Sequence, residues 1–301
     1  MALDESLLKA VNSYAETIRS LAGTVASNSS IENDLRRSAA HRVSRPIDYM
    51  RYAEFGAVLA RLQLQPGSLV LDAGGPQWLT FALAAKHPQV QFQYVNFADY
   101  ELQPFEKIRT LLQLDNLVIS KEDLRQLSFS DNQFDEIFSI SVLEHIFPEE
   151  GGDIVALREL KRVLKQGGSL VITTPCKDKP NVVYVQGGVY ERNSPTNEKQ
   201  FYAREYSAPS LKALIGHADF TDTEIAYISE SPSLASIDYL EWGPLRGNPF
   251  AGLLLKFFRR LERFSGIPVE RILASSKLSV VTTEMPRLVN AVVKMQKSVA
   301  A

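Results

Sequence analysis

The chain has 301 residues, of which 45% are hydrophobic, and its 33 Lys and Arg residues nearly balance 35 Asp and Glu residues. This composition can bury a full core and excludes a disordered chain. The near-balance of charge excludes a global field that would attract nucleic acid. A single cysteine, Cys176, excludes an internal disulfide and a multi-cysteine metal site. The length suits one enlarged α/β domain, or one domain with a small helical cap.

The first residues carry acid, Asp4 and Glu5, where a secretory signal would need a basic segment. No uninterrupted apolar run reaches the roughly 18 residues that a bilayer-spanning helix needs. Together with the single cysteine, these features predict a cytoplasmic protein.

The N-terminal segment has apolar residues at helical spacing. They are Leu3, Leu7, Val11, Tyr14, Ile18 and Leu21. We expect a helical cap over residues 1–45 that packs on the following domain or meets a partner. A helix over about 45–62 follows, and it ends at the turn Gln65–Gly67.

From residue 68 onward, predicted strands alternate with predicted helices. The strands are expected at 68–72, 91–97, 117–120, 134–140, 169–174, 223–229 and 278–283, and the helices at 79–86, 105–114, 153–164 and 208–217. This alternation predicts an α/β fold with a doubly wound, mostly parallel sheet of the Rossmann-like kind. Residues 176–207 are polar, aromatic and punctuated by Gly and Pro, which is typical of a functional loop or lid. Residues 231–277 are expected to form a helical insertion.

The segment 120–175 contains the most specific pattern. A strand at 134–140 is followed by a helix, a turn at Gly167–Gly168 and a second strand that ends at Pro175. In an open parallel sheet, ligands bind beyond the carboxyl ends of the strands. In these residues the chain resembles the class I S-adenosylmethionine (SAM)-dependent methyltransferases. The resemblance implies a SAM-methyltransferase domain over 46–301, with a seven-stranded sheet closed by an antiparallel strand pair.

The family has an acidic residue and a glycine-rich turn after its first strand. Here Asp72 and Gly74 match that pattern and Gly75 follows, so the resemblance implies that they seat the donor. Pro76 and Trp78 stand where further glycines are usual. Proline also removes an amide donor, so the turn must differ in shape. We expect Trp78 either to pack under the following helix or to line the cofactor cleft.

The ribose position departs from the family pattern. The family normally has an acid at the end of its second strand, and that place falls on Asn96. An amide can bond a hydroxyl, but it lacks the charge that roughly doubles the strength of such a bond. Asp99 and Glu101 follow closely and could substitute.

The adenine position is a better match. The resemblance implies that Asp123 accepts from the adenine amino group and that the backbone amide of Leu124 faces a ring nitrogen. The alternative for Asp123 is a helix or turn cap.

The segment 139–146 resembles the family segment that passes beneath the methyl donor, which includes Ser139 in the cofactor site. His145 is the candidate general base, because an unperturbed imidazole titrates near neutral pH. The alternative is a hydrogen bond to a neighbouring loop. Glu144 either orients His145 or caps a helix. None of the other histidines has ligand spacing with another metal-binding residue, so we expect no metal.

The acceptor side is expected in the lid and at its exit, where aromatic residues interleave with arginine. Tyr190, Tyr202 and Arg204 are the candidate substrate residues, with ordinary lid packing as the alternative. Residues 252–264 have an apolar stripe flanked by basic residues, which indicates either a packed amphipathic helix or peripheral contact with a membrane.

These observations predict a SAM-dependent enzyme that transfers a methyl group to a small-molecule, sugar or lipid acceptor, at oxygen. A non-catalytic binding or scaffold protein with a degenerate cofactor turn is the alternative. The absence of G-x-G-x-x-G argues against a third class, the dinucleotide-binding oxidoreductases.

Overall fold

The computed structural model describes residues 3–189, 198–231, 249, 252–254, 256–258, 260 and 268–299. The chain divides into two compact units, the first formed by Met1–Ala60 and Ala226–Val289 and the second by Arg61–Ile225 and Asn290–Ala301. The boundaries fall inside strands β8 (Asp222–Glu230) and β10 (Leu288–Gln296).

The first unit contains the three N-terminal helices. Its described elements are α1 (Glu5–Ser27), α2 (Asn33–Ser44), α3 (Tyr49–Leu59), α10 (Val269–Lys277) and β9 (Leu278–Val281), together with the end of β8. Asp4 caps α1 by accepting from the amide of Ser6 at 2.7 Å. The buried face of α1 includes Val11, and a Cβ on Gly56 of α3 would lie 3.2 Å from the Val11 side chain. Val11, Tyr14 and Ile18 of the predicted periodicity are buried, and α1 packs on both α2 and α3.

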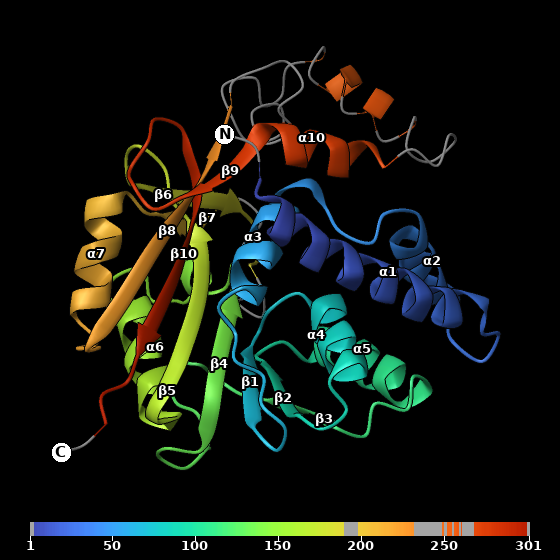
Figure 1. The fold of residues 1–301 in the computed structure, drawn as a ribbon, viewed down its shortest axis with the longest axis horizontal. Helices are drawn as coiled ribbons and strands as arrows, with labels where there is room; N and C mark the ends of the chain where they lie inside the picture. Colours follow the sequence, from blue (N-terminus) through green and yellow to red (C-terminus); the bar gives the residue numbers. More distant parts are fainter. Residues whose placement is uncertain are drawn as a thin grey trace. The chain divides into compact units, whose positions relative to one another are not determined.

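The second unit is built on a mostly parallel sheet (Figure 1). Its parallel strands are β1 (Leu69–Ala73), β2 (Gln91–Asn96), β3 (Leu117–Lys121), β4 (Phe134–Ile140) and β5 (Leu164–Pro175). They lie in the order β3-β2-β1-β4-β5, and β10 follows antiparallel to β5. β1 therefore lies between β2 and β4, where the strand order reverses.

Helices connect these strands on both sides of the sheet. The connecting helices are α4 (Gln77–Lys86), α5 (Asp99–Leu111) and α6 (Gly152–Val163), and α7 (Ala208–Gly216) comes later in the chain, before β8. The chain adds β2 and β3 on one side of β1, and it adds β5 on the opposite side, next to β4. Because crossover connections are right-handed, α4 and α5 lie on one face of the sheet and α6 lies on the other. The rings of Phe81, Tyr94 and Phe105 pack edge to face, at centroid distances of 4.3 and 4.4 Å, and join α4, β2 and α5 in the core.

The predicted fold class is confirmed, with differences in detail. The mixed sheet has eight strands rather than seven, because β10 was not predicted and the expected last strand corresponds to β9. β9 pairs antiparallel with β8. The expected loop at 176–207 contains an antiparallel hairpin, β6 (Asn181–Gln186) with β7 (Lys199–Glu205). Backbone pairing gives residues 181–186 and 199–205 a strand conformation that the polar composition did not indicate.

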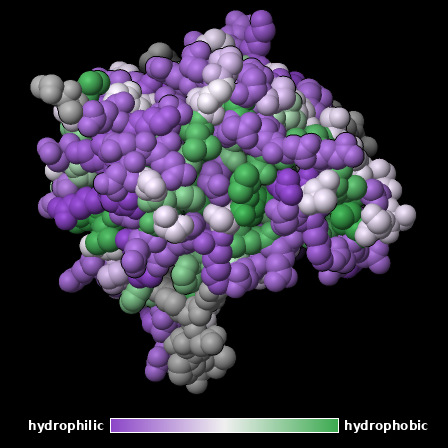
Figure 2. All heavy atoms as spheres, turned by 90° about the horizontal axis from the view of Figure 1, so that it is seen from below, coloured by the Kyte–Doolittle hydropathy of each residue, from purple (hydrophilic) through white to green (hydrophobic). Residues whose placement is uncertain are grey.

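Within the predicted insertion 231–277, α10 is described in full, and of the predicted amphipathic helix 252–264 the residues 252–254, 256–258 and 260 are described, as helix. Among the helices that are described, none combines the length and hydropathy needed to cross a bilayer. The face drawn in Figure 2 is mainly hydrophilic, with smaller apolar areas between the polar side chains. The cytoplasmic location and the membrane contact stay predictions.

Candidate functional site

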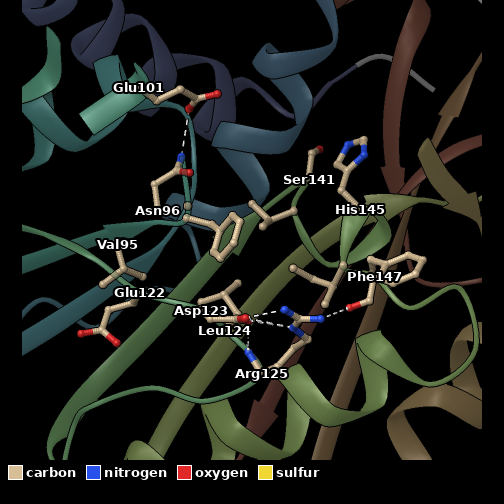
Figure 3. A pocket seen from close by; sticks show the side chains of 14 residues that line it. Val95, Asn96, Glu101, Glu122, Asp123, Leu124, Arg125, Ser141, His145 and Phe147 are labelled. Atoms are coloured by element: carbon tan, nitrogen blue, oxygen red, sulfur yellow. Dashed lines mark hydrogen bonds and ion pairs between the residues drawn. The ribbon is translucent and has the colours of Figure 1, made fainter. Parts of the chain in front are cut away.

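A cavity of about 450 Å³ opens beyond the carboxyl ends of the parallel strands of the second unit. Its walls come from Gly74 after β1, from 95–97 at the end of β2, from 122–125 after β3 and from the segment 141–147 after β4. Figure 3 shows the side chains from these segments. We call this cavity the strand-end cavity. It lies where the strand order reverses, which is the usual ligand position in an open α/β sheet.

The turn after β1 is held together by Asp72. The carboxylate is fully buried and accepts from the Gly75 amide at 2.7 Å and from the Thr80 hydroxyl. Burial raises the pKa of Asp72 to about 7. A Cβ on Gly75 would lie 2.7 Å from Asp72 Oδ1, so the turn requires glycine there. Asp72 and Gly75 therefore shape the turn and do not line the cavity.

Gly74 is the residue of this turn that reaches the cavity. Its φ of +83° is in the left-handed region, which favours glycine. Pro76 stands at the N-cap of α4, and Trp78 packs edge to face on Phe81 at 5.5 Å. Neither lines the cavity. The packing interpretation of Trp78 therefore holds, and the substitutions for glycine leave the cavity open.

Asn96, at the end of β2, forms a hydrogen bond with the carboxylate of Glu101. Its Nδ2 donates to Glu101 Oε2 at 2.9 Å and to the Tyr94 hydroxyl at 3.1 Å, and its Oδ1 accepts from the Ala98 amide at 3.0 Å. The dashed line in Figure 3 marks the bond to Glu101. Both Asn96 and Glu101 line the cavity. Burial raises the pKa of Glu101 above its ordinary value.

The second acid of this region behaves differently. Asp99 forms an exposed ion pair with Lys121 at 2.6 Å and does not line the cavity. Of the two acids that could substitute for the missing acid at position 96, Glu101 is therefore the one at the site.

After β3, Asp123 is paired with Arg125. The Arg125 guanidinium donates to both carboxylate oxygens of Asp123 at 2.5–3.1 Å, and its backbone amide donates to Asp123 Oδ1 at 2.9 Å. Arg125 holds the pKa of Asp123 below its usual value. The guanidinium also donates to the Phe147 carbonyl at 2.9 Å, which joins the segments after β3 and β4 (Figure 3). Leu124 lies between these partners and lines the cavity.

Ser139 and Ser141 mark the end of β4. Ser139 is buried and donates to the Ala73 carbonyl at 3.0 Å, so it fastens β4 to β1 and does not line the cavity. Ser141 does line it, with φ at +54° and its amide donating to Thr173 Oγ1 at 3.1 Å.

His145 lines the cavity from the short 3-10 helix η1 (Leu143–His145). Its Nδ1 lies 2.8 Å from the Tyr202 carbonyl oxygen, and its ring packs edge to face on the Tyr202 ring at 4.8 Å. Because a carbonyl only accepts, Nδ1 carries the proton and the lone pair of the neutral imidazole is on Nε2. The carboxylate of the buried Glu144 lies 3.9 Å from Nε2.

The predicted substrate residues are placed differently from one another. Arg204 is 8% exposed and directs its donors to main-chain carbonyls of the segment 144–149. Tyr202 contacts His145, as described above. Tyr190 lies outside the described residues.

The sequence interpretation missed Arg125, Phe97 and Phe147 as cavity residues. Phe97 and Phe147 are 45% and 46% exposed, unusual for phenylalanine. Phe97 is the last residue of the predicted strand 91–97, and its place at the strand's carboxyl end could have indicated it. Among the described residues, no group of three or more His, Cys, Asp or Glu side chains is placed to hold a metal ion.

The comparisons with known proteins agree with this geometry. A family model described as "Methyltransferase domain" matches residues 71–172, from β1 into β5. No curated protein matches the chain by sequence.

Solved structures share the fold at low identity. The [4+2]-cyclase SpnF is 18% identical, with 87% of this chain and 82% of that chain covered and a TM-score of 0.50. The YcgJ protein from Bacillus subtilis is 15% identical, with 82% and 100% covered and a TM-score of 0.50. Phosphoethanolamine N-methyltransferase 2 from Haemonchus contortus, solved in complex with SAM, is 15% identical, with 82% and 52% covered and a TM-score of 0.49. Residues 71–172, about a third of the chain, are thus similar to a methyltransferase domain, as the resemblance to the class I SAM-dependent methyltransferases implied.

Proposed function

We propose that the strand-end cavity binds SAM and that the methyl group is transferred to the oxygen of a small-molecule, sugar or lipid-headgroup acceptor. The observation that carries the proposal is the Asn96–Glu101 pair, which supplies a carboxylate at the end of β2 although the family's usual acid is absent. The volume of about 450 Å³ is within the range of roughly 300–1,000 Å³ that small-molecule sites have.

The residues around the cavity fit the three parts of the donor. Gly74 has no Cβ and allows the backbone to approach the amino-acid end. Glu101 accepts from the ribose hydroxyls, in the role that the sequence suggested for Asn96. Asp123 keeps lone pairs for the adenine amino group beside its bonds to Arg125, because each carboxylate oxygen has two. The amide of Leu124 reads a ring nitrogen.

SAM supplies an electrophilic methyl group on a positively charged sulfur, so the acceptor needs alignment more than a strong base. His145 lines the cavity with its basic nitrogen at Nε2. It takes the proton of the acceptor hydroxyl at that atom as the oxygen gains the methyl group. Glu144, 3.9 Å from Nε2, then faces the imidazolium and favours it.

The alternative of a non-catalytic fold depended on Pro76, Trp78 and Asn96. Pro76 and Trp78 lie outside the cavity, whereas Asn96 lines it together with Glu101. The fold alone does not identify the acceptor, since a structure with a TM-score of 0.50 to this chain is named a [4+2]-cyclase. The acceptor therefore needs a test of its own.

The donor site is tested by calorimetry with S-adenosylhomocysteine on Glu101→Gln and the matched control Asp99→Asn. Both acids lie in the first turn of α5, but only Glu101 lines the cavity. A hydrogen bond to a charged group contributes about 1.5–3 kcal/mol, so E101Q should raise Kd by about 10- to 150-fold. D99N should leave Kd unchanged. Equal affinities for wild type and E101Q would remove Glu101 from the site.

The transfer step is tested with a panel of hydroxyl-bearing and amine-bearing acceptors and radiolabelled SAM. His145→Gln should lower kcat for a hydroxyl acceptor while the Kd for S-adenosylhomocysteine stays the same. Turnover of amines alone would overturn O-methylation.

A further inference from the structure

We propose that strand β7 sets the tautomer and the ring orientation of His145, and that Arg204 is the positioning residue. The inference rests on the proposed function, because it concerns the residue proposed there as the base. It assigns to Arg204 the task of holding the segment that carries His145, in place of the acceptor contact that the sequence suggested.

The first observation is the direct contact between β7 and the imidazole. The Tyr202 carbonyl accepts from His145 Nδ1 at 2.8 Å, across 57 residues of sequence. The hydrogen bond at one ring nitrogen decides which tautomer the neutral ring adopts. Nε2 is therefore the nitrogen that can accept a proton. The edge-to-face packing of the Tyr202 ring, at 4.8 Å and 66°, fixes the orientation of the ring as well.

The second observation is the set of bonds made by Arg204, two residues further along the same strand. Its guanidinium donates to the carbonyls of Glu144, Ile146, Pro148 and Glu149 at 2.5–3.4 Å. Two of these carbonyls, at 144 and 146, are on either side of His145. The side chain thus binds the backbone of the His145 segment directly.

A buried carboxylate holds Arg204 in turn. Asp153 Oδ2 lies 3.3 Å from Arg204 Nε and also accepts from the Tyr206 hydroxyl at 2.7 Å. The side chains of Arg204 and Asp153 are each 9% exposed. The Phe201 ring lies 4.8 Å from the guanidinium carbon, within the range of cation–π contacts. Buried and paired on several sides, the guanidinium has one defined position.

These contacts join strand β7 to the segment 144–149. If the segment 144–149 shifted away from β7, the Nδ1 bond would break and the imidazole could adopt either tautomer. A planar guanidinium with five donors can bridge several carbonyls at once, whereas an ammonium is a point charge with three donors. Arg204→Lys keeps the charge and removes this bridging geometry.

The test reads the tautomer by nitrogen NMR and needs no acceptor. The chain has four histidines, so ¹⁵N-histidine labelling gives few signals, and His145→Gln assigns the relevant one. At about pH 8.5, above the ordinary imidazole pKa, wild type should show His145 in one tautomer with the proton on Nδ1. A wild-type ring with its proton mainly on Nε2 would overturn the proposal.

The matched control for Arg204→Lys is Arg162→Lys. Arg162 also donates to main-chain carbonyls, those of Leu127 and Phe129 at 2.9–3.0 Å, but these carbonyls lie outside the segment 144–149 that carries His145. R204K should turn the single His145 tautomer into a mixture, and R162K should leave it unchanged. A folded R204K with the wild-type tautomer would refute the role of Arg204.

If R204K does not fold, Asp153→Asn decides in its place, because it removes the charge that is paired with Arg204. D153N should also give mixed tautomers, and an unchanged single tautomer would count against the proposal. Affinity for S-adenosylhomocysteine, measured on each folded variant, separates this proposal from the proposed function. A wild type that fails to bind the donor analogue would refute the proposed function, whatever tautomer His145 adopts.

Discussion

Asp72→Asn should make the stability of the chain less dependent on pH. The wild-type carboxyl has a pKa of about 7 in the folded state, against 3.8 for an unperturbed group, because it is fully buried. The folded protein therefore binds more protons at Asp72 than the unfolded chain does between these pH values. This contribution to stability is complete below about pH 4 and is lost as the pH rises through 7.

The magnitude follows from the two pKa values. A full unit corresponds to 1.36 kcal/mol, so the free energy that Asp72 contributes falls by about 2.5 kcal/mol between pH 5 and pH 8. Asn has no proton to lose over this range. Its Oδ1 can still accept from the Gly75 amide, and its Nδ2 can donate to Thr80 Oγ1, because a hydroxyl also accepts. D72N should therefore gain about 2.5 kcal/mol relative to wild type as the pH rises from 5 to 8.

The assay is urea unfolding of both proteins at several pH values in a Trp242→Phe background. The chain has two tryptophans, so Trp78, in the helix that follows the Asp72 turn, is then the sole indole reporter. Taking the difference between two proteins at each pH cancels the other titrating groups. Asp72→Ala is the control, and it should be less stable than D72N by about 1–3 kcal/mol at every pH, because the Gly75 amide loses its acceptor. A wild-type to D72N difference that stays constant within about 0.5 kcal/mol would refute the raised pKa.

Three other substitutions test the fold and the site. Gly74→Ala should destabilise the second unit by about 1–2 kcal/mol, measured by urea unfolding, because its φ of +83° is unfavourable for an L-residue with a Cβ. Lys297→Met should lower the melting temperature, because the half-buried amine donates to three carbonyls at the end of α6, whereas the exposed Lys107→Met should not. Glu270→Ala should cost about 3–5 kcal/mol, since this buried carboxylate pairs with an arginine at 2.7 Å and accepts from the first amide of α3. The exposed Asp34→Asn should change stability by less than about 0.5 kcal/mol in the same denaturation assay.

The regular part of the fold could be predicted from apolar runs. The predicted strand 68–72 lies within one residue of β1, because buried parallel strands are continuous apolar segments. β10 was missed, since Asn290 and Lys294 interrupt its apolar run. The start of α5 was also placed too late, at residue 105 instead of Asp99. That error matters for the site, because it hides the fact that Glu101 lies in the first turn of a helix beside Asn96.

The role of individual polar residues was harder to predict, because it depends on partners distant in sequence. Arg204 lies among aromatic residues, which favours a substrate clamp, but its carbonyl partners are 55–60 residues away. Asp123 and Arg125 are two residues apart, yet no periodicity indicates that they pair side chain to side chain. Short-range patterns specify elements, whereas these contacts appear only once the elements are placed together.

The Asn96–Glu101 pair gives the last prediction, which concerns an exchange of charge. The amide at 96 donates to Glu101 at 2.9 Å, so Asn96→Asp would bring two carboxylates together and raise the pKa of the pair. N96D should therefore weaken the binding of S-adenosylhomocysteine, although it restores the family's usual acid. The double variant N96D/E101Q again places one carboxylate beside one amide and should recover affinity to within a few-fold of wild type. If calorimetry shows that N96D alone binds as tightly as wild type, Glu101 is not the carboxylate that the donor contacts. If the double variant binds no better than E101Q, the position of the carboxylate at α5 matters as well as its presence, and the two acids are not interchangeable.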